Sequence, residues 1–136
     1  MTDAITRAPL TLQMSFLALD GMNKAPVYPS RLFWPGLPVA GGVVRLSTDD
    51  QVETGLAITE GLEDAKSIID HGMEPVWACL SAGSIANFPV LGGIEALTIC
   101  ADADDAGQRA ATKCMERWRA AGREVTIAFP IGGAKD

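Results

Sequence analysis

Three aspartates stand directly after an apolar stretch in the second half of the sequence. Residues 97–101 (LTICA) have the composition of a buried strand, and Asp102, Asp104 and Asp105 come next, ahead of Gly107. Carboxylates at the carboxyl end of a strand lie where open α/β sheets bind their ligands. If the chain stays extended there, Asp102 and Asp104 leave it on the same side and can share one cation. Hard oxygen ligands of this kind predict a site for Mg²⁺ or Mn²⁺.

A second acid stands at the equivalent place after another predicted strand, where residues 56–59 run into Glu60-Gly61. Parallel strands joined by right-handed crossovers end at the same edge of a sheet, so we expect Glu60 to converge with Asp102 and Asp104. We expect Gly61 to allow a sharp turn of the backbone and to leave room for a bulky phosphate. The three acids are therefore the candidate catalytic and metal-binding residues.

Alternating strands and helices are expected to hold these acids. Apolar runs predict strands over 56–59, 76–80, 97–101 and 125–129. Apolar residues at helical spacing predict helices over 62–70 and from 106 to 121, each closed by a glycine, with one helical turn near residue 84. The pattern predicts βαβ units, and hence an α/β fold with a parallel sheet of about four strands flanked by helices.

The first 53 residues are less regular. Residues 11–19 and 43–47 predict two strands that pair antiparallel and extend the main sheet, and Asp20-Gly21 begins a turn after the first of them. Residues 24–38 hold four prolines, which predicts an extended or looped connection. We expect an N-terminal extension over residues 1–53 and a catalytic core over 54–136 within one compact domain.

Composition bounds the class of protein. The 136 residues are 48% hydrophobic, with a mean hydropathy of +0.17 and a formal charge of −6. No apolar run has the length of a membrane span, and three scattered cysteines suggest reduced thiols, so we expect a cytoplasmic protein without a membrane partner. The negative charge is the wrong sign for gripping nucleic acid by bulk electrostatics. Either the partner is not a polyanion, or metal ions neutralise the gathered acids, or other domains supply a basic surface.

The two acidic motifs resemble those of the Toprim domain, in the branch found in phage- and plasmid-type primases and primase-helicases. The family pattern, an acid-glycine pair and then Asp-x-Asp-x-x-Gly, is matched by Glu60-Gly61 and by Asp102 to Gly107. Further similarity lies in residues 58–64, 75–78, 81–83 and 120–125, in the segment Lys24-Ala-Pro26 and in Gly41-Gly42.

The resemblance implies a Toprim (Rossmann-like) fold and a Mg²⁺- or Mn²⁺-dependent nucleotidyltransferase that synthesises primers in DNA replication. It implies a single-stranded DNA template and nucleoside triphosphates as substrates, and zinc-binding or helicase domains or replication proteins as partners that this sequence does not supply. The isolated domain is then expected to be weakly active or inactive. The residues implied are Glu60 as the acid/base or metal-positioning group, Asp102 and Asp104 as metal ligands, Asp64 (or Glu63) and Asp136 as further acids, and Lys24, Arg31, Gly61 and Gly107 as nucleotide- or nucleic-acid-binding positions.

Other interpretations of the same residues stay open. A Toprim nuclease would use the same acids to hydrolyse a phosphodiester, and a docking module would keep the fold without catalysis. A receiver domain also gathers acids at strand ends, but the Glu60-Gly61 pair fits it poorly. Asp104 or Asp105 could simply cap the following helix, and Glu63 and Asp64 could be surface acids that favour a helix dipole.

Several residues are expected to be structural. Five basic residues, Arg109, Lys113, Arg117, Arg119 and Arg123, form either a stripe for template or phosphate or, more simply, a solvated helix face. We expect His71 to end a helix, Trp77 and Trp118 to lie in the core and Trp34 to lie at the surface.

Overall fold

The computed structural model describes residues 1–129 and contains one six-stranded sheet in the order β1-β4-β6-β5-β7-β8. Four strands are parallel: β5 (Gly55–Thr59), β6 (Val76–Ala78), β7 (Ala96–Cys100) and β8 (Glu124–Ala128). β4 (Gly42–Arg45) adds antiparallel to β6, and β1 (Thr2–Asp3) adds antiparallel to β4. The predicted α/β fold with a parallel sheet and an added antiparallel strand pair is confirmed.

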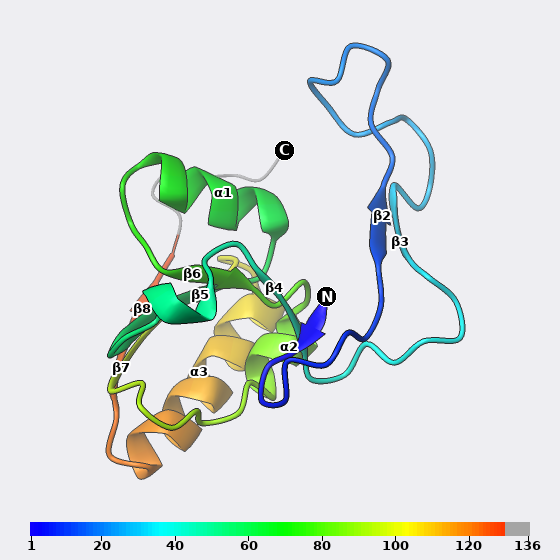
Figure 1. Cartoon of the computed structure of the whole chain (residues 1–136). Helices are drawn as coiled ribbons and strands as arrows, with labels where there is room; N and C mark the ends of the chain where they lie inside the picture. The colour runs from blue at the N-terminus through cyan, green and yellow to red at the C-terminus, as the bar shows by residue number, and fades with distance from the viewer. Residues whose placement is uncertain (130–136) are drawn as a thin grey trace.

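Helices cover both faces of this sheet. α1 (Leu62–Asp70) lies on one face, and α2 (Ala82–Ala86) and α3 (Asp105–Ala120) lie on the other (Figure 1). A short 3₁₀ helix, η1 (Asp49–Gln51), precedes β5. The predicted helices over 62–70 and from about 106, and the single turn near residue 84, are confirmed. In the part of the chain described here, no helix is long and apolar enough to cross a membrane.

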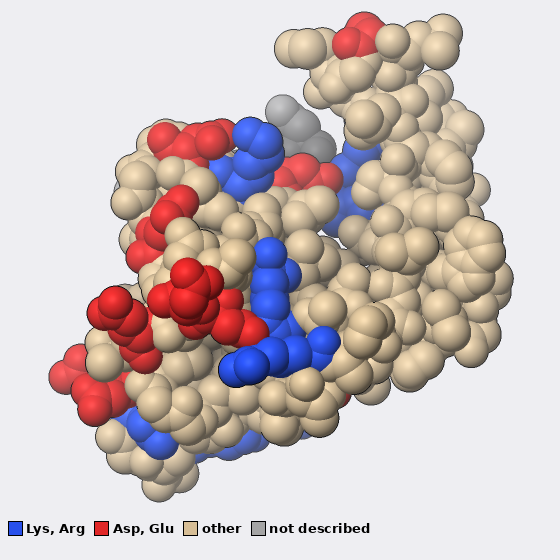
Figure 2. Space-filling view, in the orientation of Figure 1, with Lys and Arg blue, Asp and Glu red and all other residues tan. Residues whose placement is uncertain are grey.

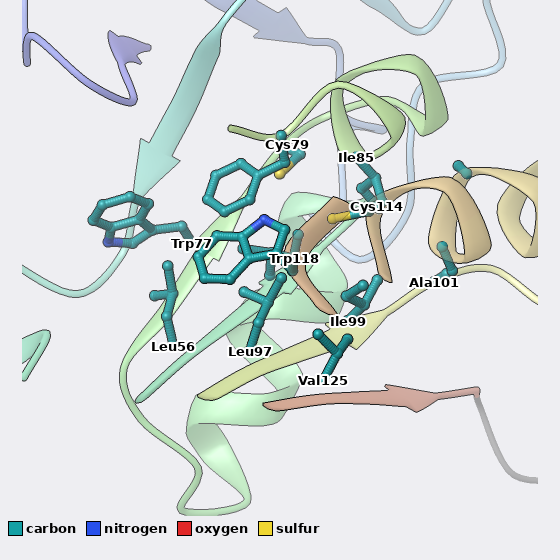
Figure 3. Close-up of a cluster of buried hydrophobic side chains, with 14 of the residues drawn as sticks. Leu56, Trp77, Cys79, Ile85, Leu97, Ile99, Ala101, Cys114, Trp118 and Val125 are labelled. Atoms are coloured by element: carbon teal, nitrogen blue, oxygen red, sulfur yellow. The ribbon is translucent and has the colours of Figure 1, made fainter. Parts of the chain in front are cut away.

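The main core lies between the sheet and the α2–α3 layer. Trp118 of α3 is fully buried and stacks on Phe88, with 5.9 Å between the ring centroids and 5° between the planes (Figure 3). Trp77 is also buried, whereas Trp34 is exposed, as predicted. His71 caps the end of α1, where its Nδ1 contacts the Ser67 carbonyl oxygen at 2.7 Å. These residues are structural, and none of them lies at the carboxyl edge of the sheet.

Residues 12–37 form an arm that projects from the body (Figure 1). Its two short strands, β2 (Gln13–Ser15) and β3 (Arg31–Phe33), pair antiparallel with each other as a separate two-stranded sheet. The prediction that residues 11–19 pair with 43–47 is therefore wrong. The partner of β2 comes from the proline-rich segment predicted as a loop, while the strand at 42–45 pairs with β6 and with the N-terminal β1.

The two faces of the arm differ because side chains alternate along each strand. Phe33 packs against the apolar cluster beneath α1, and Arg31 lies on the same face of β3. The opposite face is largely exposed and apolar; it carries Leu12, Met14, Phe16, Leu32 and Trp34. The arm thus presents one basic, docked face to the body of the molecule.

Candidate functional site

Glu60 follows β5, a central strand of the parallel sheet with β6 and β7 on either side. Thr59 is fully buried, and its hydroxyl donates to the Gly61 carbonyl oxygen at 2.7 Å, which fixes the chain as it leaves the strand. Gly61 is the N-cap of α1 with φ −96° and ψ 152°, an ordinary extended conformation. The expectation that a glycine is needed here for a sharp turn is wrong. A Cβ at Gly61 would instead lie 2.9 Å from Asp64 Oδ2, so the glycine makes room for that carboxylate.

Asp102 follows β7, which ends at Cys100. Asp104 is the N-cap of α3, and its Oδ1 accepts a hydrogen bond of 2.7 Å from the Gly107 backbone N–H. Strand alternation therefore does not relate Asp102 to Asp104, because the strand ends before both. The capping interpretation of Asp104 is confirmed, and its shared cation with Asp102 stays a prediction.

Gly107 holds the Asp102 loop against α3. It is buried in the first turn of the helix, and a Cβ there would lie 2.2 Å from the Asp102 carbonyl oxygen. No side chain fits into that gap. Gly107 thus acts on Asp102 through backbone packing, and it is not among the described residues that line the cavity beside Asp102.

A cavity of about 340 Å³ lies at this edge of the sheet and joins the two acidic motifs. The described residues that line it are Lys24, Arg31, Glu60, Gly61, Glu63, Asp64, Leu80 and Asp102. Most of the candidate residues from the sequence are thereby brought together, across three strand ends, the start of α1 and the arm. Asp104 does not line the cavity within the described residues, and Asp136 lies outside them.

Two basic side chains of the arm face the acids of the body. Arg31 Nη2 lies 3.1 Å from Glu63 Oε1, and Lys24 Nζ lies 3.9 Å from the same oxygen. Figure 2 shows basic atoms on the inner side of the arm, next to acidic atoms of the body. Sequence reasoning did not anticipate that Glu63 would be the partner of both cations, since the residues are far apart in the chain and no local signal relates them.

A second, mostly apolar cavity of about 310 Å³ adjoins the first, because Asp64 lines both. Cys100 and Phe129 line this second cavity from the ends of β7 and β8. Burial raises the pKa of the Cys100 thiol, and the nearby Asp64 carboxylate raises it further. The thiol is thus kept protonated at neutral pH, which makes it a poor nucleophile or metal ligand.

The donor chemistry of the larger cavity suits a hard divalent cation. Within residues 1–129 no three acidic, cysteine or histidine side chains are close enough to form a metal cage. Mg²⁺ seldom needs such a cage, because it keeps several waters and binds through one or two carboxylates together with substrate phosphates. Glu60 and Asp102, from adjacent strand ends on one cavity, therefore fit this cation.

Most of the five basic residues considered as a stripe are structural. Arg117 donates to the carbonyl oxygens of Phe88 (2.9 Å) and Ala86 (2.6 Å) and so ties α3 to the end of α2. Arg119 and Arg123 likewise donate to carbonyl oxygens, those of Val125 and Ile94. Of the five residues considered as a stripe, three thus hold the fold together, an arrangement that neither interpretation of the sequence included.

Comparison with known proteins places this architecture in a family. The family described as Toprim domain matches residues 55–136. The chain belongs to the Toprim-domain family, as the two motifs predicted. No curated protein sequence matches it.

Among solved structures, the chain is similar to a DNA primase domain from Pseudomonas aeruginosa, with a TM-score of 0.59 and 18% sequence identity. The similarity covers 98% of this chain and 49% of that one, so this chain spans about half of the length of that domain. The alignment thus extends beyond residues 55–136, which match the family, to nearly the whole chain.

Proposed function

We propose that this chain is the catalytic Toprim domain of a DNA primase and that it transfers nucleotides in a Mg²⁺- or Mn²⁺-dependent reaction. The observation that carries the proposal is the single cavity that joins Glu60, Asp102, Lys24 and Arg31. Acids that can hold a metal and cations that can hold phosphate are what nucleotidyl transfer requires in one place.

The proposal assigns a role to four of the side chains that line the cavity. Glu60 and Asp102, which both line the cavity, would hold the metal ion. The bound ion supplies positive charge that stabilises the oxygens of the reacting phosphate. Arg31 and Lys24 bind the phosphates that leave, since a guanidinium gives paired hydrogen bonds to phosphate and an ammonium gives a point charge.

The reaction joins a 3′-hydroxyl to the α-phosphorus of a nucleoside triphosphate. The new bond forms between the 3′-oxygen and the α-phosphorus, and the bond from that phosphorus to its bridging oxygen breaks, which releases pyrophosphate. The hydroxyl proton passes to Glu60 or through it to water. Binding of the pyrophosphate by Arg31 and Lys24 offsets the negative charge that develops on the leaving group.

The DNA template is expected to require surface from outside this chain. The formal charge of −6 disfavours binding to a polyanion, and the similar primase domain is about twice as long as this chain. We therefore propose that zinc-binding, helicase or other replication proteins supply the basic surface that holds single-stranded DNA. A cytoplasmic location follows from this role in replication.

The first experiment is calorimetric titration with Mg²⁺ and Mn²⁺ of the wild type and of Asp102→Asn. We expect the substitution to abolish binding. Asp105→Asn is the matched control, because it removes the same charge three positions away at a residue that does not line the cavity, and it should bind like the wild type. Equal binding by all three proteins would refute the assignment of Asp102.

The second experiment separates a primase from a nuclease. The assay mixture contains this chain, the other primase domains or replication proteins, labelled nucleotides and labelled single-stranded DNA. It is run with Mg²⁺ and again with Mn²⁺. Incorporation that is lost in Asp102→Asn supports the proposal. Metal-dependent cleavage without incorporation would favour the nuclease, and neither activity would favour a docking module.

A further inference from the structure

Glu63 forms ion pairs with two basic residues of the arm, Lys24 and Arg31. Its Oε1 lies 3.1 Å from Arg31 Nη2 and 3.9 Å from Lys24 Nζ, while its Oε2 would lie 3.5 Å from a Cβ built on Gly61. The carboxylate is thus held between the arm and the glycine of the Glu60-Gly61 motif. That is the space into which the proposed function brings a phosphate.

We infer that the Glu63 carboxylate stands in for a substrate phosphate, and that polyphosphate binding displaces it from Arg31 and Lys24. This inference rests on the proposed function, since it concerns the same two cations. The sequence resemblance left open whether Glu63 or Asp64 is a further acid of the metal site. The inference gives Glu63 a different role, as a partner of the two cations.

The exposure of the three side chains keeps the free-energy cost of this exchange small. The side chains of Glu63, Lys24 and Arg31 are 58%, 43% and 29% exposed. Ion pairs this exposed are weak because water screens them. A polyphosphate carries more charge than a carboxylate and offers more oxygens for charge-assisted hydrogen bonds, so it should win the competition for the two cations.

The pairing also protects the rest of the site. Lys24 and Arg31 share a cavity with Glu60 and Asp102, and cations so close to metal ligands would compete with the metal for them. Glu63 pairs with both cations and so competes with the metal ligands for them. Glu63 is therefore a positioning residue that affects the reaction through Arg31 and Lys24.

The test measures binding of tripolyphosphate, first without a metal ion, at about 0.05 M salt, where charges interact over about 10 Å or more. Compared with the wild type, Glu63→Gln should bind about two- to fivefold more tightly, because the two cations no longer have to leave a carboxylate. Glu116→Gln is the matched control. It removes the same charge from the exposed side of α3, away from the cavity, and corrects for the change in net charge.

A double substitution tests whether the effect passes through the arm. In a protein that already carries Arg31→Gln, Glu63→Gln should raise the affinity for tripolyphosphate by less than it does in the wild type. The reason is that the nearer partner of Glu63 is already gone. Mg²⁺ is then added with the tripolyphosphate. Under the inference the advantage of Glu63→Gln persists, whereas a metal ligand at this position would make the substituted protein bind more weakly.

Three results would overturn the inference: Glu63→Gln binding no more tightly than Glu116→Gln, weaker binding by Glu63→Gln in the presence of Mg²⁺, or no binding of tripolyphosphate by either protein. The measurement without a metal ion does not depend on Asp102 or on catalysis. Failure of the proposed primase activity would therefore leave this result interpretable, and failure of the exchange would leave the nucleotide-incorporation assay unaffected.

Discussion

Replacing Gly107 by alanine tests how α3 positions the loop that carries Asp102. The added Cβ would lie 2.2 Å from the Asp102 carbonyl oxygen and 2.9 Å from its carbon. Both contacts are with backbone, so no side chain can rotate away. To bring the nearer contact to 3.0 Å, the loop and helix must separate by about 0.8 Å, the difference between 3.0 Å and 2.2 Å.

The expected cost can be estimated from two opposing effects. Overpacking of this kind costs about 1–3 kcal/mol, and alanine in place of glycine within a helix contributes about 1 kcal/mol in the other direction. The difference is about 0–2 kcal/mol, so we expect Gly107→Ala to lower the free energy of unfolding by up to about 2 kcal/mol, and the melting temperature by roughly 4 °C for each kcal/mol lost. Urea unfolding and a thermal scan measure both.

Gly83→Ala is the matched control for this substitution. Gly83 also lies in the first turn of a helix, α2, but the nearest atom to its added Cβ is Ser81 Oγ at 3.9 Å. Alanine should fit there and leave the protein equally stable or more stable by up to about 1 kcal/mol. If Gly107→Ala behaved like Gly83→Ala, the close approach of α3 to the Asp102 backbone would be wrong.

Gly107→Ala should also affect the candidate metal site at Asp102. A displacement near 1 Å at a catalytic group can cost on the order of 100-fold in rate. Under the proposed function, Gly107→Ala should weaken Mg²⁺ binding well below that of Gly83→Ala when both are measured under conditions where they are folded. Loss of stability with unchanged metal binding would mean that Asp102 does not hold the ion.

Three further predictions address capping, thiol titration and the basic face of α3. Asp104→Asn should keep the stability of the wild type, because asparagine caps helices as well as aspartate, whereas Asp104→Ala should lose about 1 kcal/mol; equal unfolding midpoints in urea for both would contradict the cap. Burial raises the pKa of Cys114 to about 11, against about 8.5 in an unfolded chain. The unfolded state therefore releases the thiol proton first as pH rises, and stability should fall between about pH 8.5 and 11 with a steeper slope in the wild type than in Cys114→Ala, a difference that unfolding curves over this pH range would reveal. Arg117→Met should cost about 1–3 kcal/mol through the loss of two charged hydrogen bonds to carbonyl oxygens. Lys113→Met should stay within about 0.5 kcal/mol, and equal effects of the two substitutions on urea unfolding would contradict the structural role of Arg117.

The elements that hold the acids could be predicted because their signals are local. An apolar run and a glycine lie within a few residues of each other at β5–α1 and at β7–α3, where a capping aspartate is added, and the observed bounds follow the predicted ones closely. The convergence of Glu60 and Asp102 followed from topology, since parallel strands with right-handed crossovers end at one edge. Local pattern and one handedness rule were enough for this half of the site.

The arm could not be predicted from such signals. β3 is three residues long, too short for an alternating pattern to show, and it lies between prolines that favour a loop. β1 is shorter still. Which strands pair was decided by tertiary packing, in which Phe33 contributes to the cluster beneath α1. The pairing of Glu63 with Lys24 and Arg31 depends on that docking and has no signature in the sequence.

The site is thus divided between two parts of the chain with opposite charge. The acids come from the ends of the parallel strands and the start of α1, whereas both basic side chains that line the cavity in residues 1–129 come from the arm. A boundary near residue 53 describes the order of elements along the chain, but residues on both sides of it line this cavity. Replacing Lys24 and Arg31 together by glutamine removes both cations and leaves the strands that carry Glu60 and Asp102 unchanged. Under the proposed function this variant should still bind Mg²⁺ while losing affinity for polyphosphate, and the arm then belongs to the catalytic unit.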